Sequence, residues 1–89
     1  MKIEFDPAKD EANRIKHGVS LAAAAEIDLE QARIVEDRRF DYGETRFTAY
    51  APLNGRLHAL CFTWRGEVLR AIGLRKARRD ERRRYDESR

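Results

Sequence analysis

The hydrophobic pattern at the N-terminus begins with a two-residue alternation and then changes to a helical period. Ile3 and Phe5 alternate with charged neighbours, which predicts a short strand. A helix should follow, because Asp6 can cap its N-terminus and Gly18 can adopt the left-handed conformation that commonly ends a helix. Its expected apolar face consists of Ala8, Ala12, Ile15 and Val19. A second, alanine-rich helix is expected from residue 21 to about residue 28.

The middle of the chain has the period of strands. The expected strands cover residues 32–37, 44–53, 56–64 and 68–74, with a polar connection over residues 38–43. Asn54-Gly55 is a strong hairpin signal, because both positions of a two-residue type I′ turn require a positive φ. That turn places Phe47 opposite Phe62, on the face that should meet the helices.

The same register predicts the opposite face of the sheet. With a second two-residue turn near Arg65-Gly66, Arg70 would lie beside Cys61. The residues expected on this face are Arg46, Thr48, Thr63 and Arg70 at one end, with Tyr50 and Ile72 nearer the other. An arginine- and threonine-rich sheet face can cradle a phosphate backbone. A slip of one residue would instead turn Arg70 to the core face.

These elements follow one another in the order β-α-α-β-β-β-β-α. We therefore predict an α+β fold in a single domain, residues 1–89, with a small antiparallel sheet and two N-terminal helices packed on one face. From about Lys76 the chain should form a C-terminal basic helix, with Ala77, Glu81 and Tyr85 along one side.

Composition excludes several classes of protein. Of the 89 residues, 42% are hydrophobic and 39% are charged, which is too apolar for a disordered chain. No stretch approaches the roughly 20 apolar residues of a membrane helix, so no membrane association is expected. Glu4 and Asp6 lie where a signal peptide would need an apolar run, which makes the cytoplasm the expected location. The single cysteine, Cys61, excludes an internal disulfide and any multi-cysteine zinc site.

The positive charge is concentrated at the C-terminus. The net charge is +3, yet residues 75–89 alone contain eight basic and four acidic side chains. Most of the basic residues are arginines, whose planar and permanently charged group matches phosphate oxygens. This distribution suggests a polyanionic partner, nucleic acid first. The alternative is a solvated helix end held by its own salt bridges.

Five short motifs carry a resemblance to a known family. They are Phe5-Asp6-x-x-Lys9, Asn13-x-x-Lys16-His17-Gly18-Val19-Ser20, Gly43-Glu44-x-Arg46-Phe47, Arg70-x-Ile72-x-x-Arg75-Lys76-Ala77 and Glu81-Arg82-Arg83-x-Tyr85. In this order and spacing, over nearly the whole chain, the sequence resembles the BrnT toxins. These are small RelE-like endoribonucleases of bacterial type II toxin–antitoxin pairs. Gly73-Leu74 departs from the pair that usually precedes Arg75 in the family.

The resemblance implies a RelE-like fold and a toxin that cleaves RNA and arrests growth without a metal or other cofactor. It also implies a cognate, DNA-binding, BrnA-like antitoxin, encoded by a neighbouring gene, that binds and neutralises the toxin. A heterotetramer with that antitoxin is one assembly that the resemblance allows.

Metal-free RNA cleavage uses the 2′-hydroxyl as nucleophile, so it needs a proton acceptor and cations that stabilise the charged phosphorane. The candidate catalytic residues are Arg46, Arg70 and Arg75 as phosphate clamps, Lys16 and His17 for charge or proton transfer, and Tyr85 for a hydrogen bond or base stacking. The candidate RNA-binding residues are Lys76, Arg78, Arg79, Arg82 and Arg83. No metal site is expected, because the two histidines and the cysteine are far apart in sequence.

Each candidate also has a purely structural interpretation. Lys16 and His17 close a helix, where the dipole favours cations. Arg46 can pair with an acidic neighbour, Arg75 can anchor the junction of strand and helix, and Tyr85 can pack. Two functions therefore compete with the ribonuclease: a non-catalytic module that binds RNA or DNA, and an interaction protein whose basic helix binds an acidic antitoxin.

Overall fold

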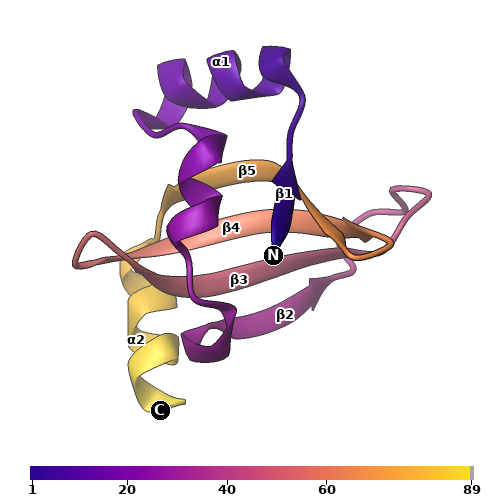
Figure 1. Cartoon of the computed structure of the whole chain (residues 1–89). Coiled ribbons are helices and arrows are strands. Elements are labelled where there is room, and N and C mark those ends of the chain that lie inside the picture. Colours follow the sequence, from indigo (N-terminus) through magenta and orange to yellow (C-terminus); the bar gives the residue numbers. More distant parts are fainter. Residues whose placement is uncertain (89) are drawn as a thin grey trace.

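The computed structural model describes residues 1–88 and consists of a five-stranded sheet with helices around it (Figure 1). In chain order the elements are β1 (Lys2–Glu4), α1 (Pro7–His17), the 3-10 helices η1 (Leu21–Glu26) and η2 (Leu29–Gln31), β2 (Arg33–Asp37), β3 (Arg46–Leu53), β4 (Arg56–Arg65), β5 (Val68–Lys76) and α2 (Arg79–Glu87). The strands lie in the order β1-β5-β4-β3-β2. The predicted α+β class and the predicted sequence of strands are confirmed.

The sheet is mixed, although the sequence pattern predicts an antiparallel one. β1 runs parallel to β5, with Ile3 opposite Leu69, while the remaining neighbours are antiparallel. The prediction is wrong for β1 because no hairpin joins it to its neighbour. A tight turn forces two strands to run antiparallel, whereas a strand that is distant in sequence can pair in either direction.

The hairpin between β3 and β4 has the predicted register. Asn54 and Gly55 have φ angles of 53° and 77°, as a type I′ turn requires. Phe47 lies opposite Phe62, and the two rings stack with their centroids 5.6 Å apart. This pair therefore contributes to the core face of the sheet, as expected.

The hairpin between β4 and β5 differs from the prediction. Its turn is Gly66-Glu67, so Arg70 lies opposite Thr63 and not beside Cys61. The turn is displaced because Gly66 takes the positive φ, 61°, that the first turn position requires. A β-bulge then shifts the register between Cys61 and Phe62 and leaves Ile72, expected on the outer face, without a partner on β4.

This bulge decides where Arg75 points. Side chains five positions apart in a regular strand lie on opposite faces, so Arg70 and Arg75 would be separated. Because the bulge adds one residue to β5, Arg75 pairs with Ala59, whose other neighbour across the sheet is Tyr50. We call this face, which carries Thr48, Tyr50, Cys61 and Arg75, the outer face of the sheet. Bulges commonly redirect side chains in this way near functional sites.

Helix α1 has the predicted ends but not the predicted apolar face. Asp6 accepts a hydrogen bond from the Ala8 amide at 2.9 Å, and Gly18 has a φ of 72°. Ile15, however, is 80% exposed, and Asn13 is the buried residue of the helix. Figure 1 shows α1 beyond the β5 side of the sheet rather than flat on its face. The Asn13 side chain ties it there through hydrogen bonds to Val19 and Leu74.

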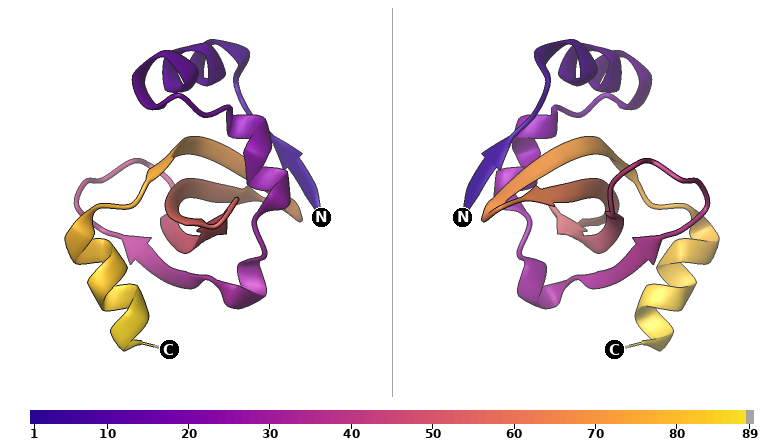
Figure 2. Two further views of the ribbon diagram at one scale, coloured as in Figure 1. Left: turned by 90° about the vertical axis from the view of Figure 1, so that its left-hand side faces the viewer. Right: turned by 90° about the vertical axis from the view of Figure 1, so that its right-hand side faces the viewer.

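The expected second helix forms as the 3-10 helix η1. Its first turn is capped by Ser20, which accepts from the Ala22 amide. Leu21, Ala24 and Ile27 are buried and pack onto the core face of the sheet. The rest of the buried core cluster is Ala49, Ala51, Leu53, Leu60, Phe62, Leu69, Ala71 and Leu74. Figures 1 and 2 show η1 crossing one face of the sheet.

Helix α2 begins three residues later than expected, at Arg79, because β5 continues to Lys76. Its side chains Glu81 and Tyr85 are buried, and Glu81 contacts Tyr50 and Arg75, so the helix starts beside the outer face. Figure 2 shows α2 and η1 on different sides of the sheet. Within residues 1–88, every helix is too short or too polar to cross a membrane.

Candidate functional site

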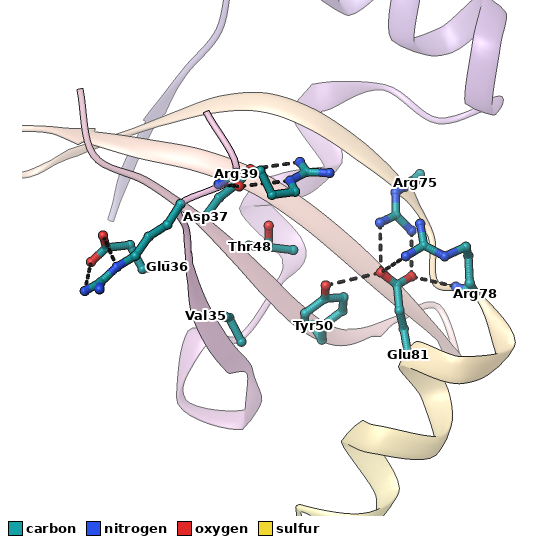
Figure 3. Close-up of a pocket in the computed structure, with 10 residues that line it drawn as sticks. Val35, Glu36, Asp37, Arg39, Thr48, Tyr50, Arg75, Arg78 and Glu81 are labelled. Carbon is teal, nitrogen blue, oxygen red and sulfur yellow. Dashed lines mark hydrogen bonds and ion pairs between the residues drawn. The ribbon is translucent and has the colours of Figure 1, made fainter. Parts of the chain in front are cut away.

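The outer face of the sheet is hollowed where β2, β3 and β5 meet the start of α2. The cavity has a volume of about 260 Å³. It is lined by Val35, Glu36, Asp37, Arg38, Arg39, Thr48, Tyr50, Arg75, Arg78 and Glu81 (Figure 3). We call it the central cavity. Four of these residues are arginines, and Figure 3 shows Arg39 and Arg75 on opposite sides of it with Thr48 and Tyr50 on its floor.

Glu81 organises one wall of the central cavity. Its buried carboxylate accepts two hydrogen bonds from the guanidinium of Arg75, at 2.7 and 2.9 Å. It also accepts from the backbone amide of Arg78 at 2.8 Å and from the hydroxyl of Tyr50 at 3.2 Å. The bond from Arg78 is the helix cap of α2. One carboxylate therefore caps the helix and fixes the orientation of a cation and a phenol.

The protonation states in this cluster follow from the same contacts. The Arg75 hydrogen bonds lower the pKa of Glu81 to about 2, from an ordinary value of 4.5. The Glu81 carboxylate in turn raises the pKa of Arg75. Burial first, then the charge of Glu81, raises the pKa of Tyr50. At neutral pH the cluster thus holds a carboxylate, a guanidinium and a protonated phenol.

Asp37 plays the same part on the opposite wall. Its side chain is 4% exposed and accepts hydrogen bonds from the Arg39 guanidinium at 3.0 and 2.9 Å. The hydroxyl of Tyr42 donates to it at 3.0 Å. The hydrogen bond from Arg39 lowers the pKa of Asp37 far below its ordinary value. Two buried carboxylates therefore each hold one arginine at the central cavity, and the Arg39 side chain is 75% exposed whereas that of Arg75 is 31% exposed.

A second, smaller cavity adjoins the first along Arg39, Thr48 and Arg75. Its volume is about 150 Å³, and His17 reaches it from the end of α1. Burial lowers the pKa of His17, and the charges of Lys16 and Arg75 lower it further. The imidazole is therefore neutral at pH 7 and can accept a proton. Gly73 also lines this cavity, and a Cβ there would meet Asn13 and Cys61 only at ordinary contact distances.

The structure brings three of the predicted site residues together. Arg75, His17 and Arg78 surround the two cavities. Arg75 also anchors the junction of strand and helix through its contact with Glu81, as its structural interpretation predicts, while its role as a phosphate clamp stays a prediction. Lys16 is exposed and does not line either cavity, although its charge acts on His17.

The other predicted catalytic residues lie elsewhere. Arg46 pairs with Glu44 at 3.0 Å and stacks on the Tyr42 ring at 4.1 Å, outside both cavities. Arg70 pairs with Glu4 of β1 at 3.4 Å. Tyr85 is 8% exposed, and its hydroxyl donates to the backbone oxygen of Gln31 at 2.8 Å. The packing interpretation of Tyr85 therefore describes its place in the fold.

The predicted RNA-binding residues form an exposed band that leads away from the central cavity along α2. Lys76 ends β5, and Arg79, Arg82 and Arg83 follow on the helix. Arg82 donates to the backbone oxygen of Ala77 at 3.2 Å. Among the ion pairs formed within residues 1–88, none involves Arg79 or Arg83. Their charges are available to an external anion.

Sequence reasoning missed Arg39 and the role of Asp37. Arg39 lies in the expected polar connection and Asp37 at the end of the strand before it, although the run Glu36-Asp37-Arg38-Arg39 places acids and arginines two residues apart. That spacing produces the Arg39–Asp37 and Arg38–Glu36 pairs of the structure and was the available signal. The contact between Tyr50 and Glu81 had no local signal, because 31 residues separate them.

These features define a small α+β protein with an arginine-lined cavity on the outer face of its sheet. No group of three or more His, Cys, Asp and Glu side chains suited to a metal ion occurs within residues 1–88. The sequence model of one protein family, the ribonuclease toxin BrnT of type II toxin–antitoxin systems, matches residues 5–81. The chain belongs to this family, which confirms the resemblance seen in the motifs.

A solved structure supports the assignment independently. The crystal structure of the Brucella abortus ribonuclease toxin BrnT superposes with a TM-score of 0.73 at 29% sequence identity. The match covers 89% of this chain and 99% of the Brucella chain. No curated protein sequence matches. Family membership makes RNA the expected substrate class and an antitoxin the expected partner.

Proposed function

We propose that this chain is a RelE-like endoribonuclease that acts in the cytoplasm without a metal ion. Its active site is the pair of adjoining cavities on the outer face, with Arg75 and Arg39 as phosphate-binding cations. Its activity arrests growth, and a cognate, DNA-binding, BrnA-like antitoxin from a neighbouring gene neutralises it, in a heterotetramer with the toxin. The single observation that supports the site most strongly is the bidentate contact of Arg75 with buried Glu81.

Two oriented arginines supply the electrostatic part of the proposed reaction. Attack of a 2′-hydroxyl on the neighbouring phosphorus places extra negative charge on the phosphoryl oxygens. Cations that are already oriented stabilise this charge without reorganising during the reaction. Arg75 is oriented by Glu81 and Arg39 by Asp37. Their guanidiniums can therefore bind a phosphate that enters the central cavity between them.

His17 is the proposed proton acceptor. It lines the smaller cavity together with Arg75, and its lowered pKa leaves the imidazole neutral at pH 7. The imidazole takes the proton of the 2′-hydroxyl as the oxygen bonds to phosphorus. The 5′-oxygen then leaves with a proton supplied by water, which yields a 2′,3′-cyclic phosphate and a 5′-hydroxyl end. Lys16 adds positive charge next to the imidazole.

Cleavage of a purified RNA in the presence of EDTA tests this proposal. We expect cleavage to persist in EDTA, Arg75→Ala to abolish it, and Arg75→Lys to restore only a part, because lysine cannot make the bidentate contact. Arg65→Ala is the matched control, since Arg65 is an exposed arginine beside the β4–β5 turn, where it pairs with Val68 at the other end of β5 from Arg75. Arg70→Ala and Arg46→Ala, measured in parallel, test the two predicted clamps that lie outside the cavities.

Three outcomes would contradict the proposal. A folded Arg75→Ala variant that cleaves RNA at the normal rate would remove Arg75 from the site. Activity lost in EDTA and regained with Mg²⁺ would require a metal mechanism. A wild-type protein that binds RNA without cleaving it would instead identify a binding module.

Growth provides the cellular test. We expect induction of this chain alone to stop growth and co-expression of the antitoxin to restore it. Normal growth with folded protein present would argue against a toxin.

A further inference from the structure

The loop between β2 and β3 forms a third cavity next to the central one. Its volume is about 340 Å³, and it shares Glu36, Asp37, Arg38 and Arg39 with the central cavity. Arg39 therefore faces both spaces. Phe40 lines the third cavity and is 68% exposed. We call this space the loop cavity.

Phe40 is held in place although most of its ring is open. The Phe40 and Tyr42 rings form a T-shaped pair, with centroids 5.8 Å apart and planes at 73°. The Arg39 guanidinium lies 5.9 Å from the ring centroid. Tyr42 in turn is fixed by its hydrogen bond to Asp37 and by Arg46 over its own ring. An exposed aromatic ring with a fixed orientation is a surface on which a planar group can stack.

The charges of the loop cavity favour a base over a phosphate. Its lining contains four carboxylates, those of Glu36, Asp37, Asp41 and Glu44. Three of them form ion pairs, Glu36 with Arg38, Asp37 with Arg39 and Glu44 with Arg46. Asp41 forms no ion pair within residues 1–88, so its negative charge repels a phosphate, and its Oδ1 accepts from the Gly43 amide at 3.0 Å. An ionised carboxylate accepts hydrogen bonds but does not donate them. Asp41 can therefore accept a hydrogen bond from the exocyclic amino group of adenine, cytosine or guanine, which uracil lacks.

We propose that Phe40 is the stacking platform for one base of the RNA, next to the phosphate held by Arg39 and Arg75. The loop cavity selects an amino-bearing base over uracil at that position. This inference rests on the proposed function of the central cavity and adds a specificity-determining residue to it.

The test uses short RNAs with one cleavable bond, in which the base on either side is adenine, cytosine, guanine, uracil or absent. We expect Phe40→Ala to lower kcat/KM on an amino-bearing substrate by roughly 5- to 150-fold, the range for removal of one base–aromatic stack. Phe40→Trp should retain the activity. Ile15→Ala, which truncates another exposed apolar side chain, should change nothing.

The substrate without a base makes the assignment specific. Wild-type protein should cleave the RNA that lacks the base at one flanking position more slowly than the RNA that has it. Phe40→Ala should cleave these two RNAs at equal rates, because it has already lost the stacking contact. The preference for an amino-bearing base over uracil should shrink in Asp41→Asn, which keeps the size of the side chain but removes its charge. Equal effects of the missing base on wild type and Phe40→Ala would overturn the platform.

A binding measurement separates this inference from the ribonuclease proposal. The same RNAs with a 2′-deoxy nucleotide at the cleavable bond cannot react, and their affinity is measured by fluorescence anisotropy. If wild type binds but never cleaves, the ribonuclease proposal fails, while weaker binding by Phe40→Ala still supports stacking. Unchanged RNA binding by Phe40→Ala together with weaker binding of the antitoxin would overturn the inference and assign Phe40 to that interface.

Discussion

Replacing Glu81 by glutamine tests whether the carboxylate holds the site and the start of α2 together. The carboxylate is 3% exposed and accepts from Arg75, Arg78 and Tyr50. Glutamine keeps one carbonyl oxygen but turns an amide nitrogen toward these donors. The change therefore leaves buried donors without acceptors and leaves Arg75 without its counter-ion, at nearly constant side-chain volume.

The magnitude follows from the pKa of Glu81. A value of about 2 against an ordinary 4.5 corresponds to roughly 3 kcal/mol in favour of the folded state at neutral pH. The Arg75 and Arg78 side chains are 31% and 65% exposed, so solvent screens part of this attraction. We expect Glu81→Gln to lower the free energy of unfolding by about 2 kcal/mol at pH 7. For a domain of this size that lowers Tm by roughly 8–16 °C.

The effect has a definite pH dependence. Folding lowers the pKa of Glu81, so its stabilisation is complete above the unfolded pKa and disappears as pH falls through the folded one. The difference in unfolding free energy between wild type and Glu81→Gln should therefore narrow between about pH 5 and about pH 2.

Urea denaturation of both proteins across this range, with RNA cleavage measured at pH 7, provides the assay. A difference below about 0.5 kcal/mol at pH 7, within the usual range for surface substitutions, would refute the reasoning, as would a difference that does not change with pH. Retained stability with lost cleavage would show that Glu81 orients the site without supporting the fold.

Further predictions concern α1 and α2. Asn13→Ala should lower the unfolding free energy in urea by about 2–4 kcal/mol, because it leaves buried backbone groups of Leu74 without partners; a change below about 1 kcal/mol would contradict this account. Gly18→Ala should cost about 1 kcal/mol, since Gly18 has a φ of 72°; thermal melts should show the decrease, whereas equal Tm values would exclude strain there. The double variant Arg79→Ala, Arg83→Ala should weaken RNA binding and reduce the slope of log affinity against log salt concentration by about one for each phosphate that the helix no longer binds. An unchanged slope would show that this face of the helix is exposed to solvent without contacting RNA.

Much of the local structure could be predicted because a few neighbouring residues encode it. Asp6 and Gly18 set the ends of α1 through hydrogen bonds and dihedral angles within one turn of themselves. Asn54-Gly55 set the register of β3 and β4, and with it the contact of Phe47 and Phe62. The five motifs, taken together in their order and spacing from Phe5 to Tyr85, also sufficed to recognise the family.

Long-range packing decided the rest. The direction of β1 and the exposure of Ile15 depend on contacts with β5, about 60 residues away along the chain. A periodic pattern indicates which residues are apolar, but it does not say which surface will cover them.

The candidate site likewise depends partly on local sequence and partly on long-range packing. The sequence by itself identified Arg75 and His17 as candidates, because their residue types suit the chemistry. It could not place Arg75 on the outer face, since a bulge of one residue in β5 reverses the side on which this arginine lies. Nor could it show that Glu81, from a different element, would orient Arg75. Such a contact depends on two segments meeting in space, and no local propensity encodes that meeting.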